Sequence, residues 1–268
     1  MKLTRVLATG YVWTIIAFLI LPIAVVIPMS FSQAAFLRFP PVDLGFLWYG
    51  KYFSDPQWID ATFLSLKIAT GSSVIACAVG TLAALSLERT RATFKRSVTS
   101  ILSLPIVVPS IFIALGVFLV ALRFDLLDSE LLVIAAHATL SLPFVVLMVG
   151  AVVRQLDVSL ERAARIMGAG PVRAFFSVTF PALVPSLAAA FVVSFFLSFD
   201  ELIVSLFTLS GKETLPMLLW NNMRLDVSPI ITAVASLLIM ATIVFMLGAE
   251  VLRRRSTASL ASGNSEDA

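Results

Sequence analysis

The sequence is poor in the residues that build disulfides and most transition-metal sites. Its 268 residues include one cysteine, Cys77, and one histidine, His137. A single cysteine excludes an intramolecular disulfide, and zinc or haem sites need soft or imidazole ligands that this chain hardly has. The sequence therefore argues against a disulfide-stapled secreted domain and against a metalloenzyme.

Charged residues are also scarce. They make up 13% of the chain, against about 25% in ordinary soluble domains. Hydrophobic residues make up 59%, and the mean hydropathy is +1.01. A pI of about 9.3 would suggest a nucleic-acid surface in a soluble protein, but here the charges are confined to short gaps between apolar runs. The composition predicts a membrane protein surrounded by lipid, with no nucleic-acid partner.

The apolar runs are long enough for transmembrane helices, which need about 20 residues to cross a hydrocarbon core of roughly 30 Å. We predict an all-α polytopic membrane protein with six such helices. The first run follows a basic start and could pass for a signal peptide, but it is longer than the apolar core of such peptides. We expect it to remain as a helix. The six segments are 11–30, 61–85, 98–121, 131–153, 183–208 and 229–252.

The basic residues predict the orientation, because Lys and Arg favour short cytoplasmic loops. With the amino terminus inside, most of the 19 basic residues fall on the cytoplasmic side, so both termini are predicted to be cytoplasmic. Lys67 lies inside the second segment. The outer residues are Arg38, Lys51, Arg123, Lys212 and Arg224. The inner residues are Lys2, Arg5, Arg89, Arg91, Lys95, Arg96, Arg154, Arg162, Arg165, Arg173, Arg253, Arg254 and Arg255.

The inner loop, residues 154–182, is too long for a simple turn. Its sequence LERAARIMGAGPVRAFFSVTFPALVP, residues 160–185, predicts a short helix, a glycine- and proline-containing turn, and a second amphipathic segment. The segment could lie on the inner lipid headgroups, which its arginines would suit. It could instead be a docking element for another protein.

This loop resembles that of the permease subunits of ATP-binding-cassette importers, whose pattern is approximately EEAAxxxGAxxxxxFxxVxLPxxxP. Two positions depart from the pattern: Arg162 replaces the second Glu, and Phe180 replaces Leu. The first departure leaves the pairing with a partner open, because a base replaces an acid. The matching residues are Glu161, Ala163, Ala164, Gly168, Ala169, Phe175, Val178, Pro181 and Pro185.

The resemblance implies the fold of type I importer permeases, with a short cytoplasmic coupling helix that sits in a groove of a separate ATPase subunit. It implies ATPase coupling by Glu161, Ala163, Ala164, Gly168 and Ala169. Gly168 permits a tight turn that a Cβ could obstruct. The expected domains are the first helix and a periplasmic loop in 1–60, a permease core in 61–252 with the coupling loop 154–182, and a disordered cytoplasmic tail in 253–268.

The resemblance also implies the partners and the location. They are a second permease (a different chain or a second copy), two ATPase subunits and a periplasmic solute-binding protein, all at a bacterial inner membrane. We expect a transport subunit rather than an enzyme, with no cofactor of its own and with ATP used by its partners. The chain has no G-x-x-x-x-G-K-[ST] phosphate loop, and its nearest fragment, SGKET at 210–214, lacks the first Gly.

The segment SFDELIVSLFTLSGKETLPMLLWNNMR, residues 198–224, resembles permeases for spermidine and putrescine. That resemblance implies a translocation pathway for a small cationic solute such as a polyamine. Two alternatives remain: a permease for another small organic solute, and an ion-coupled secondary transporter.

The same segment holds the candidate pathway residues, Ser198, Asp200, Glu201 and Ser205. On a continuous helix the two serines and Glu201 share one stripe, while Asp200 lies about 100° away from Glu201. We therefore expect Glu201 to face the pathway and Asp200 to hold a neighbouring helix or Lys67. Helix packing, a capping box and an ion pair with Lys67 are structural alternatives for these polar residues.

Overall fold

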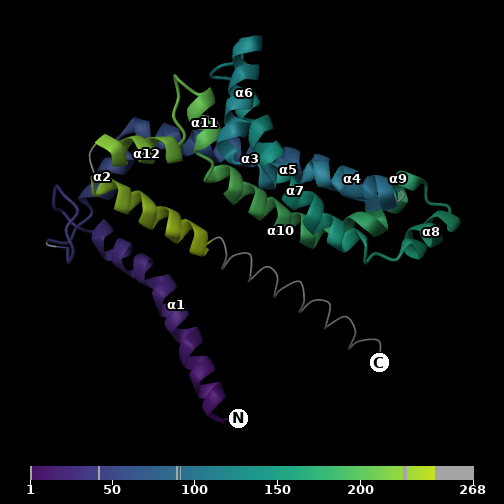
Figure 1. Ribbon diagram of the computed structural model, residues 1–268, viewed down its shortest axis with the longest axis horizontal. Coiled ribbons are helices and arrows are strands. Elements are labelled where there is room, and N and C mark those ends of the chain that lie inside the picture. The colour runs from purple at the N-terminus through teal and green to yellow at the C-terminus, as the bar shows by residue number, and fades with distance from the viewer. Residues whose placement is uncertain (1, 42, 89, 91, 226–227, 245–268) are drawn as a thin grey trace. The chain divides into compact units, whose positions relative to one another are not determined.

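The protein is described by a computed structural model over residues 2–41, 43–88, 90, 92–225 and 228–244. Within these residues it is helical, with one isolated bridge between Ser32 and Leu44 and no named strand. The chain forms two compact units, which are described separately (Figure 1): Met1–Ile59 with Leu219–Ala268, and Asp60–Leu218. The all-α prediction is confirmed. The expected tail 253–268 lies outside the described residues.

The first unit begins with α1, Lys2–Ser30. Its stretch Thr9–Ser30 is apolar and long enough to cross a membrane, where the sequence predicted 11–30. No residue of its most apolar window is buried in the structure, and its side chains are apolar all round rather than on one stripe. A second apolar helix, Ile230–Val244, covers the described part of the predicted segment 229–252.

The loop after α1 is folded around aromatic side chains. The rings of Phe31, Phe46 and Tyr49 lie within 6 Å of one another, and Ser30 Oγ and Tyr49 Oη share a hydrogen bond of 2.7 Å. Trp48 is buried and donates its indole N–H to the carbonyl of Ala34. These contacts hold the loop against the short helix α2, Leu47–Ser54.

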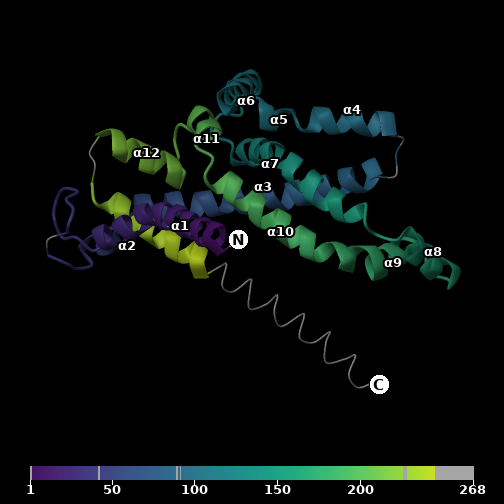
Figure 2. The same cartoon turned by 60° about the horizontal axis from the view of Figure 1, so that its bottom comes forward.

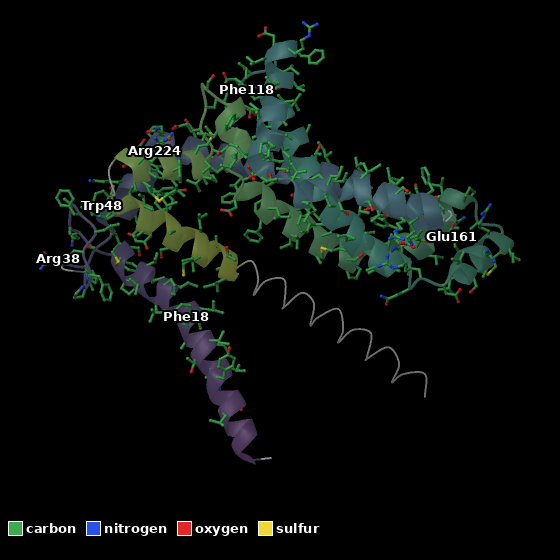
Figure 3. All side chains as sticks on the ribbon, viewed as in Figure 1. Phe18, Arg38, Trp48, Phe118, Glu161 and Arg224 are labelled. Atoms are coloured by element: carbon green, nitrogen blue, oxygen red, sulfur yellow. The ribbon has the colours of Figure 1, made fainter. Side chains whose placement is uncertain are left out.

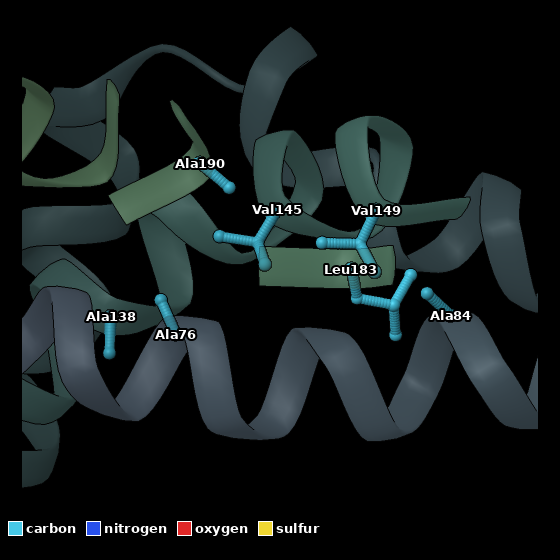
Figure 4. Packing of buried hydrophobic residues seen from close by; sticks show 7 residues of the cluster. All are labelled: Ala76, Ala84, Ala138, Val145, Val149, Leu183 and Ala190. Carbon is cyan, nitrogen blue, oxygen red and sulfur yellow. The ribbon is translucent and has the colours of Figure 1, made fainter. Parts of the chain in front are cut away.

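The second unit is built on three long helices that run side by side (Figures 1 and 2). Small residues on α3 let the other two helices approach closely. Ala76 and Ala84 of α3 pack with Val145 and Val149 of α7 and with Leu183 of α10 (Figure 4). The three helices are α3, Pro56–Glu88; α7, Glu130–Val153; and α10, Phe180–Phe199.

The third predicted helix, 98–121, is wrong as a single element, because two prolines break it. Pro105 lies in the one-turn helix α5 and Pro109 ends it, and neither has a backbone N–H to continue a helix. Val108, which precedes Pro109, is extended with ψ 126°, as the proline ring requires. Pro143 lies inside α7 without ending it. The pieces are α4, Ala92–Leu102; α5, Leu104–Val107; and α6, Ser110–Phe124.

The fifth predicted helix, 183–208, has different ends and an interruption. Its helical run begins at Pro171 with the short α9, Pro171–Ala174, and passes through a π-helical turn, Phe175–Thr179, into α10. The coupling loop is therefore shorter than the predicted 154–182, because its second segment is the start of the transmembrane helix. At the other end, α10 stops at Phe199 and α11, Ile203–Thr208, follows after a break. The helix α12, Leu215–Leu225, comes next.

The described residues include four helices that are long and apolar enough to span a membrane, together with two shorter apolar helices of 15 residues. Each of the six overlaps one of the predicted segments. Six complete crossings stay a prediction.

Candidate functional site

The short helix α8, Val158–Ile166, is the predicted coupling helix. Asp157 caps it by accepting a hydrogen bond of 2.8 Å from the backbone N–H of Ser159. That bond, with a second from the Ser159 hydroxyl, lowers the pKa of the Asp157 carboxyl. Gly168 follows the helix with φ +95°, a left-handed conformation that glycine adopts without strain. The glycine ends the helix, as the sequence indicated.

No residue of α8 is buried. Ile166 is 87% exposed and Met167 is 82% exposed, while Leu160 is also exposed. Ala163 is exposed and Ala164 is half-buried. Apolar side chains gathered on one short exposed helix are typical of an interaction surface rather than of a core element.

A side-chain contact joins α8 to the long helix that follows it. Thr179, buried in the π-helical turn, donates its hydroxyl to Glu161 Oε2 at 3.1 Å. Glu161 lies at the end of the second unit that carries α8 (Figure 3). Both residues line a cavity of about 240 Å³ whose wall also includes Glu88 and Arg154. The contact ties the half-buried Glu161 of α8 to the π-helical turn that leads into α10.

Glu88 ties three helix ends together beside that cavity. Its Oε2 lies 2.5 Å from Lys95 Nζ of α4, and its Oε1 lies 3.1 Å from Arg154 Nη1 at the end of α7. The Glu88 side chain is 11% exposed, so these pairs are better shielded from water than ordinary surface salt bridges. The base of the coupling loop is therefore anchored to α3, α4 and α7.

The two adjacent acids lie at the break between α10 and α11. Asp200 is exposed and follows the last residue of α10, with its backbone N–H bonded to the carbonyl of Phe196. Glu201 is half-buried, and its Oε1 accepts a hydrogen bond of 2.9 Å from the backbone N–H of Val204. Glu201 thus satisfies a free donor at the start of α11, much as a capping residue does.

The break alters the predicted polar stripe. Ser198 and Ser205 are buried, and both bind His137 of α7. A pathway role for the two serines stays a prediction. Lys67 does not pair with Asp200 or Glu201. Its Nζ lies 2.5 Å from Glu130 Oε2, so the predicted ion pair with the adjacent acids is wrong. The sequence does not show these pairings, because they join helices far apart along the chain.

The end of the second unit that carries α11 has its own anchor. The carboxylate of Asp128 accepts hydrogen bonds from the backbone N–H and hydroxyl of Ser210, both at 2.6 Å, and from the N–H of Gly211 at 2.8 Å. These bonds lower the pKa of Asp128 to about 2. Glu130 binds Lys67 and also Lys212. The loop after α11 is therefore fixed to the start of α7, a connection that sequence reasoning missed.

The described side chains of this unit form polar anchors at both ends of its helices. Among the described residues no cluster of three His, Cys, Asp or Glu side chains could hold a metal ion. The exposed residues of α8 lie at one end of the paired helices α7 and α10, and an exposed acid lies at a helix break toward the other end.

Comparison with known proteins decides the family. The family model described as "Binding-protein-dependent transport system inner membrane component" matches residues 76–257. The chain belongs to this family. It is a permease subunit of an ATP-binding-cassette importer, a transport component and not an enzyme. The alternative of an ion-coupled secondary transporter is therefore excluded.

Two curated relatives are similar along much of the chain. The spermidine/putrescine transport system permease protein PotC of Escherichia coli (strain K12) is 29% identical over 266 residues, covering 98% of each chain. The putrescine transport system permease protein PotI of the same strain is 34% identical over 200 residues, covering 72% of this chain and 71% of the relative.

Solved structures share the fold. A bacterial ABC transporter involved in the import of the acidic polysaccharide alginate aligns with a TM-score of 0.71 at 16% identity, covering 94% of this chain and 96% of the other. An amino acid ABC transporter aligns with a TM-score of 0.55 at 21% identity, covering 79% and 100%. These two transporters are named for different solutes, a polysaccharide and an amino acid, so the shared fold does not identify the solute.

Proposed function

We propose that this permease is one half of the transmembrane pathway of an importer for a polyamine such as putrescine or spermidine. The observation that carries the proposal is its similarity to PotC over 98% of both chains, supported by the 34% identity to PotI. Both relatives are named as permeases for these solutes. Polyamines are small and carry several ammonium groups. Their pathway therefore needs acidic groups that attract the solute without binding it too tightly to release it.

The helix break provides a suitable place for such charge. The last carbonyls of a helix carry a partial negative charge, and Asp200 adds an exposed carboxylate at that same end of α10. Both features attract an ammonium group and disfavour anions. Glu201 is engaged with the backbone of Val204, so Asp200 is the acid that we assign to solute contact. Ser198 and Ser205 lie on either side of the break and bind His137 of α7.

The partners follow from the exposed surface of α8. We propose that an ATPase subunit receives Ile166 and Met167 in a groove, with Ala163, Ala164, Gly168 and Ala169 allowing close approach. Glu161 then passes the movement to Thr179. The complete importer contains a second permease of different sequence, two ATPase subunits that use ATP, and a periplasmic solute-binding protein. Both termini of this permease lie in the cytoplasm of the bacterium.

The test is transport by the native complex, purified with its binding protein and placed in lipid vesicles. Labelled putrescine should accumulate only with ATP, and putrescine should stimulate ATP hydrolysis. The matched control solute is 1,4-butanediol, which has the same carbon chain without charge, and it should neither accumulate nor compete. ATP-driven uptake of another solute with no response to putrescine or spermidine would overturn the polyamine assignment.

A further inference from the structure

One imidazole ring spans the break between α10 and α11. His137 Nδ1 lies 2.9 Å from Ser198 Oγ in the last turns of α10, and His137 Nε2 lies 3.3 Å from Ser205 Oγ in α11. His137 is 1% exposed, and Ser205 is completely buried. Each ring nitrogen therefore binds one side of the interruption, and no water competes for these bonds.

The spacing of the two serines makes this contact sensitive to the shape of the break. Ser205 lies seven positions after Ser198, which in an uninterrupted helix would place their α-carbons about 10.5 Å apart along the axis. Hydrogen bonds of 2.9 Å and 3.3 Å to the two nitrogens of a single five-membered ring require a closer arrangement of the hydroxyls. Straightening the segment into one helix would lengthen at least one of the bonds to His137.

A third helix supports the same group. Ser72 of α3 hydrogen-bonds to Ser198 Oγ at 2.8 Å, and its hydroxyl also lies 2.7 Å from the carbonyl of Ile68. Ser72 is completely buried. The polar chain Ser72, Ser198, His137 and Ser205 thus connects α3, α10, α7 and α11. Buried polar networks whose members are all paired specify one arrangement of the elements that they join.

We propose that His137 is a positioning residue for transport: it clamps α10 and α11 in the broken arrangement that presents Asp200. The clamp holds in one conformation of the cycle and releases when the two helix segments change their angle. A movement of α8 that is transmitted along α10 then changes the angle between α10 and α11 at the break, which the hydrogen bonds of His137 define.

The test measures the joint directly. Spin labels at positions 196 and 206, both exposed, report the distance across the break in an otherwise cysteine-free Cys77→Ser background. In the assembled complex without ATP, His137→Leu should broaden or shift the distance distribution. The matched control is Ser141→Ala, one turn further along α7, because the buried Ser141 hydroxyl bonds to backbone carbonyls of its own helix. This control should leave the distribution unchanged.

A second variant keeps the proposal testable if His137→Leu fails to assemble. Ser205→Ala removes one hydroxyl from the joint and should produce a smaller change in the same direction. The double variant should change the distribution no more than His137→Leu alone, because both act on one contact. An unchanged distribution in Ser205→Ala and in an assembled His137→Leu complex, or fully additive shifts, would overturn the clamp.

Transport gives a separate readout that rests on the proposed function. Putrescine uptake per ATP hydrolysed should fall about tenfold in His137→Leu, the effect of losing roughly one buried hydrogen bond from the active arrangement. His137→Gln, which keeps one donor and one acceptor, should recover part of the coupling. Normal uptake per ATP in His137→Leu would overturn the role in transport. If the wild-type complex does not carry putrescine, the polyamine proposal fails while the distance measurement still decides the clamp.

Discussion

Two neighbouring carboxylates at the helix break show how local geometry separates the roles of similar residues. Asp200 is exposed at the carboxyl end of α10, where the helix carbonyls make the surroundings more negative. Glu201 turns back to the backbone of Val204 and completes the start of α11. Sequence periodicity assigned the pathway to Glu201 and support to Asp200, because it assumed a continuous helix. The exposure of the two residues favours the reverse.

Conservative substitutions should separate the two acids. Asp200→Asn removes the exposed charge and should lower putrescine uptake about tenfold, or about 1.4 kcal/mol in the rate-limiting barrier, at normal complex assembly. Glu201→Gln keeps an oxygen that can accept from Val204 and should retain most uptake, whereas Glu201→Ala should destabilise the complex by about 1 kcal/mol. Uptake in vesicles and the yield of complex give the comparison. Impaired uptake in Glu201→Gln with a normal Asp200→Asn would restore the sequence-based assignment.

Asp128 gives a prediction for stability and its dependence on pH. Its hydrogen bonds lower its pKa from 3.8 to about 2, so the folded state favours the charged carboxylate. The stabilisation is therefore complete above pH 3.8 and is lost as the pH falls toward 2. Asp128 also has φ +61°, which Asn tolerates better than Ala.

At neutral pH, Asp128→Ala should therefore expose the loop after α11 to protease more than Asp128→Asn does. The measurement is the rate of cleavage near residues 209–214 in the purified complex. Between pH 4 and pH 2, where the Asp128 carboxylate becomes protonated, the wild-type loop should become about as susceptible as that of the Asn variant. Equal cleavage of the wild type and Asp128→Ala at pH 7 would contradict the anchor.

At the scale of elements, the packing of α3 against α7 depends on a glycine. A Cβ added at Gly80 would lie 2.7 Å from Val145 Cγ1, which is closer than side chains tolerate. Gly80→Ala should therefore destabilise the permease by about 1–3 kcal/mol, as overpacking does. Gly116→Ala in α6 is the control, since no heavy atom lies within 4 Å of its Cβ position. Thermal unfolding in detergent should show the difference, and equal melting temperatures would argue against close packing at Gly80.

The turn after the coupling helix offers a second element-scale test. Gly168→Leu places a branched side chain on a residue with φ +95°, so the end of α8 must distort. The variant should insert normally, but ATP-driven uptake should fall at least about tenfold because the helix no longer fits its ATPase partner. Gly170→Ala is the control: Gly170 has φ −62° and open space around its Cβ position. Wild-type uptake by Gly168→Leu would refute the docking role of this turn.

Composition and hydrophobic periodicity predicted the long helices α3 and α7 to within a few residues, because burial in lipid demands long apolar segments. The same signals could not locate the break at Asp200 or the split at Pro109. A proline such as Pro109 predicts an interruption of the helix, but it does not show whether the helix bends there or ends there. At the break, the S-x-x-E pattern of Ser198 and Glu201 offered a capping box as one alternative, and Glu201 does satisfy a backbone N–H there. The contact with His137 comes from another helix and has no local signal. Contacts between distant segments, such as that of Asp128 with Ser210, produce no periodic pattern in the sequence and cannot be predicted from it.

At the scale of the whole molecule, the second unit links α8, the helix that we propose to dock on the ATPase, to the helix break through a series of contacts. Glu161 binds Thr179 at the π-helical turn, where α10 begins. α10 packs along α7 and ends at Asp200, beside Ser198 and its partner His137. Rigid helices with defined joints at both ends can carry a displacement over such a distance. The π-helical turn is one joint, as π-bulges at functional sites often are, and the break is the other.

The orientation of this series across the membrane is the last prediction. The sequence places 13 of its 19 basic residues on one side, which favours the cytoplasm. Cysteines at positions 94 and 44 replace exposed residues and can be labelled without disturbing a core. In a Cys77→Ser background, an impermeant maleimide should reach position 94 only from the cytoplasm and position 44 only from outside. This pattern places α8 and the Glu88 cluster beside the ATPase, whereas labelling of position 94 from outside would put the docking surface on the wrong side for ATP-driven import.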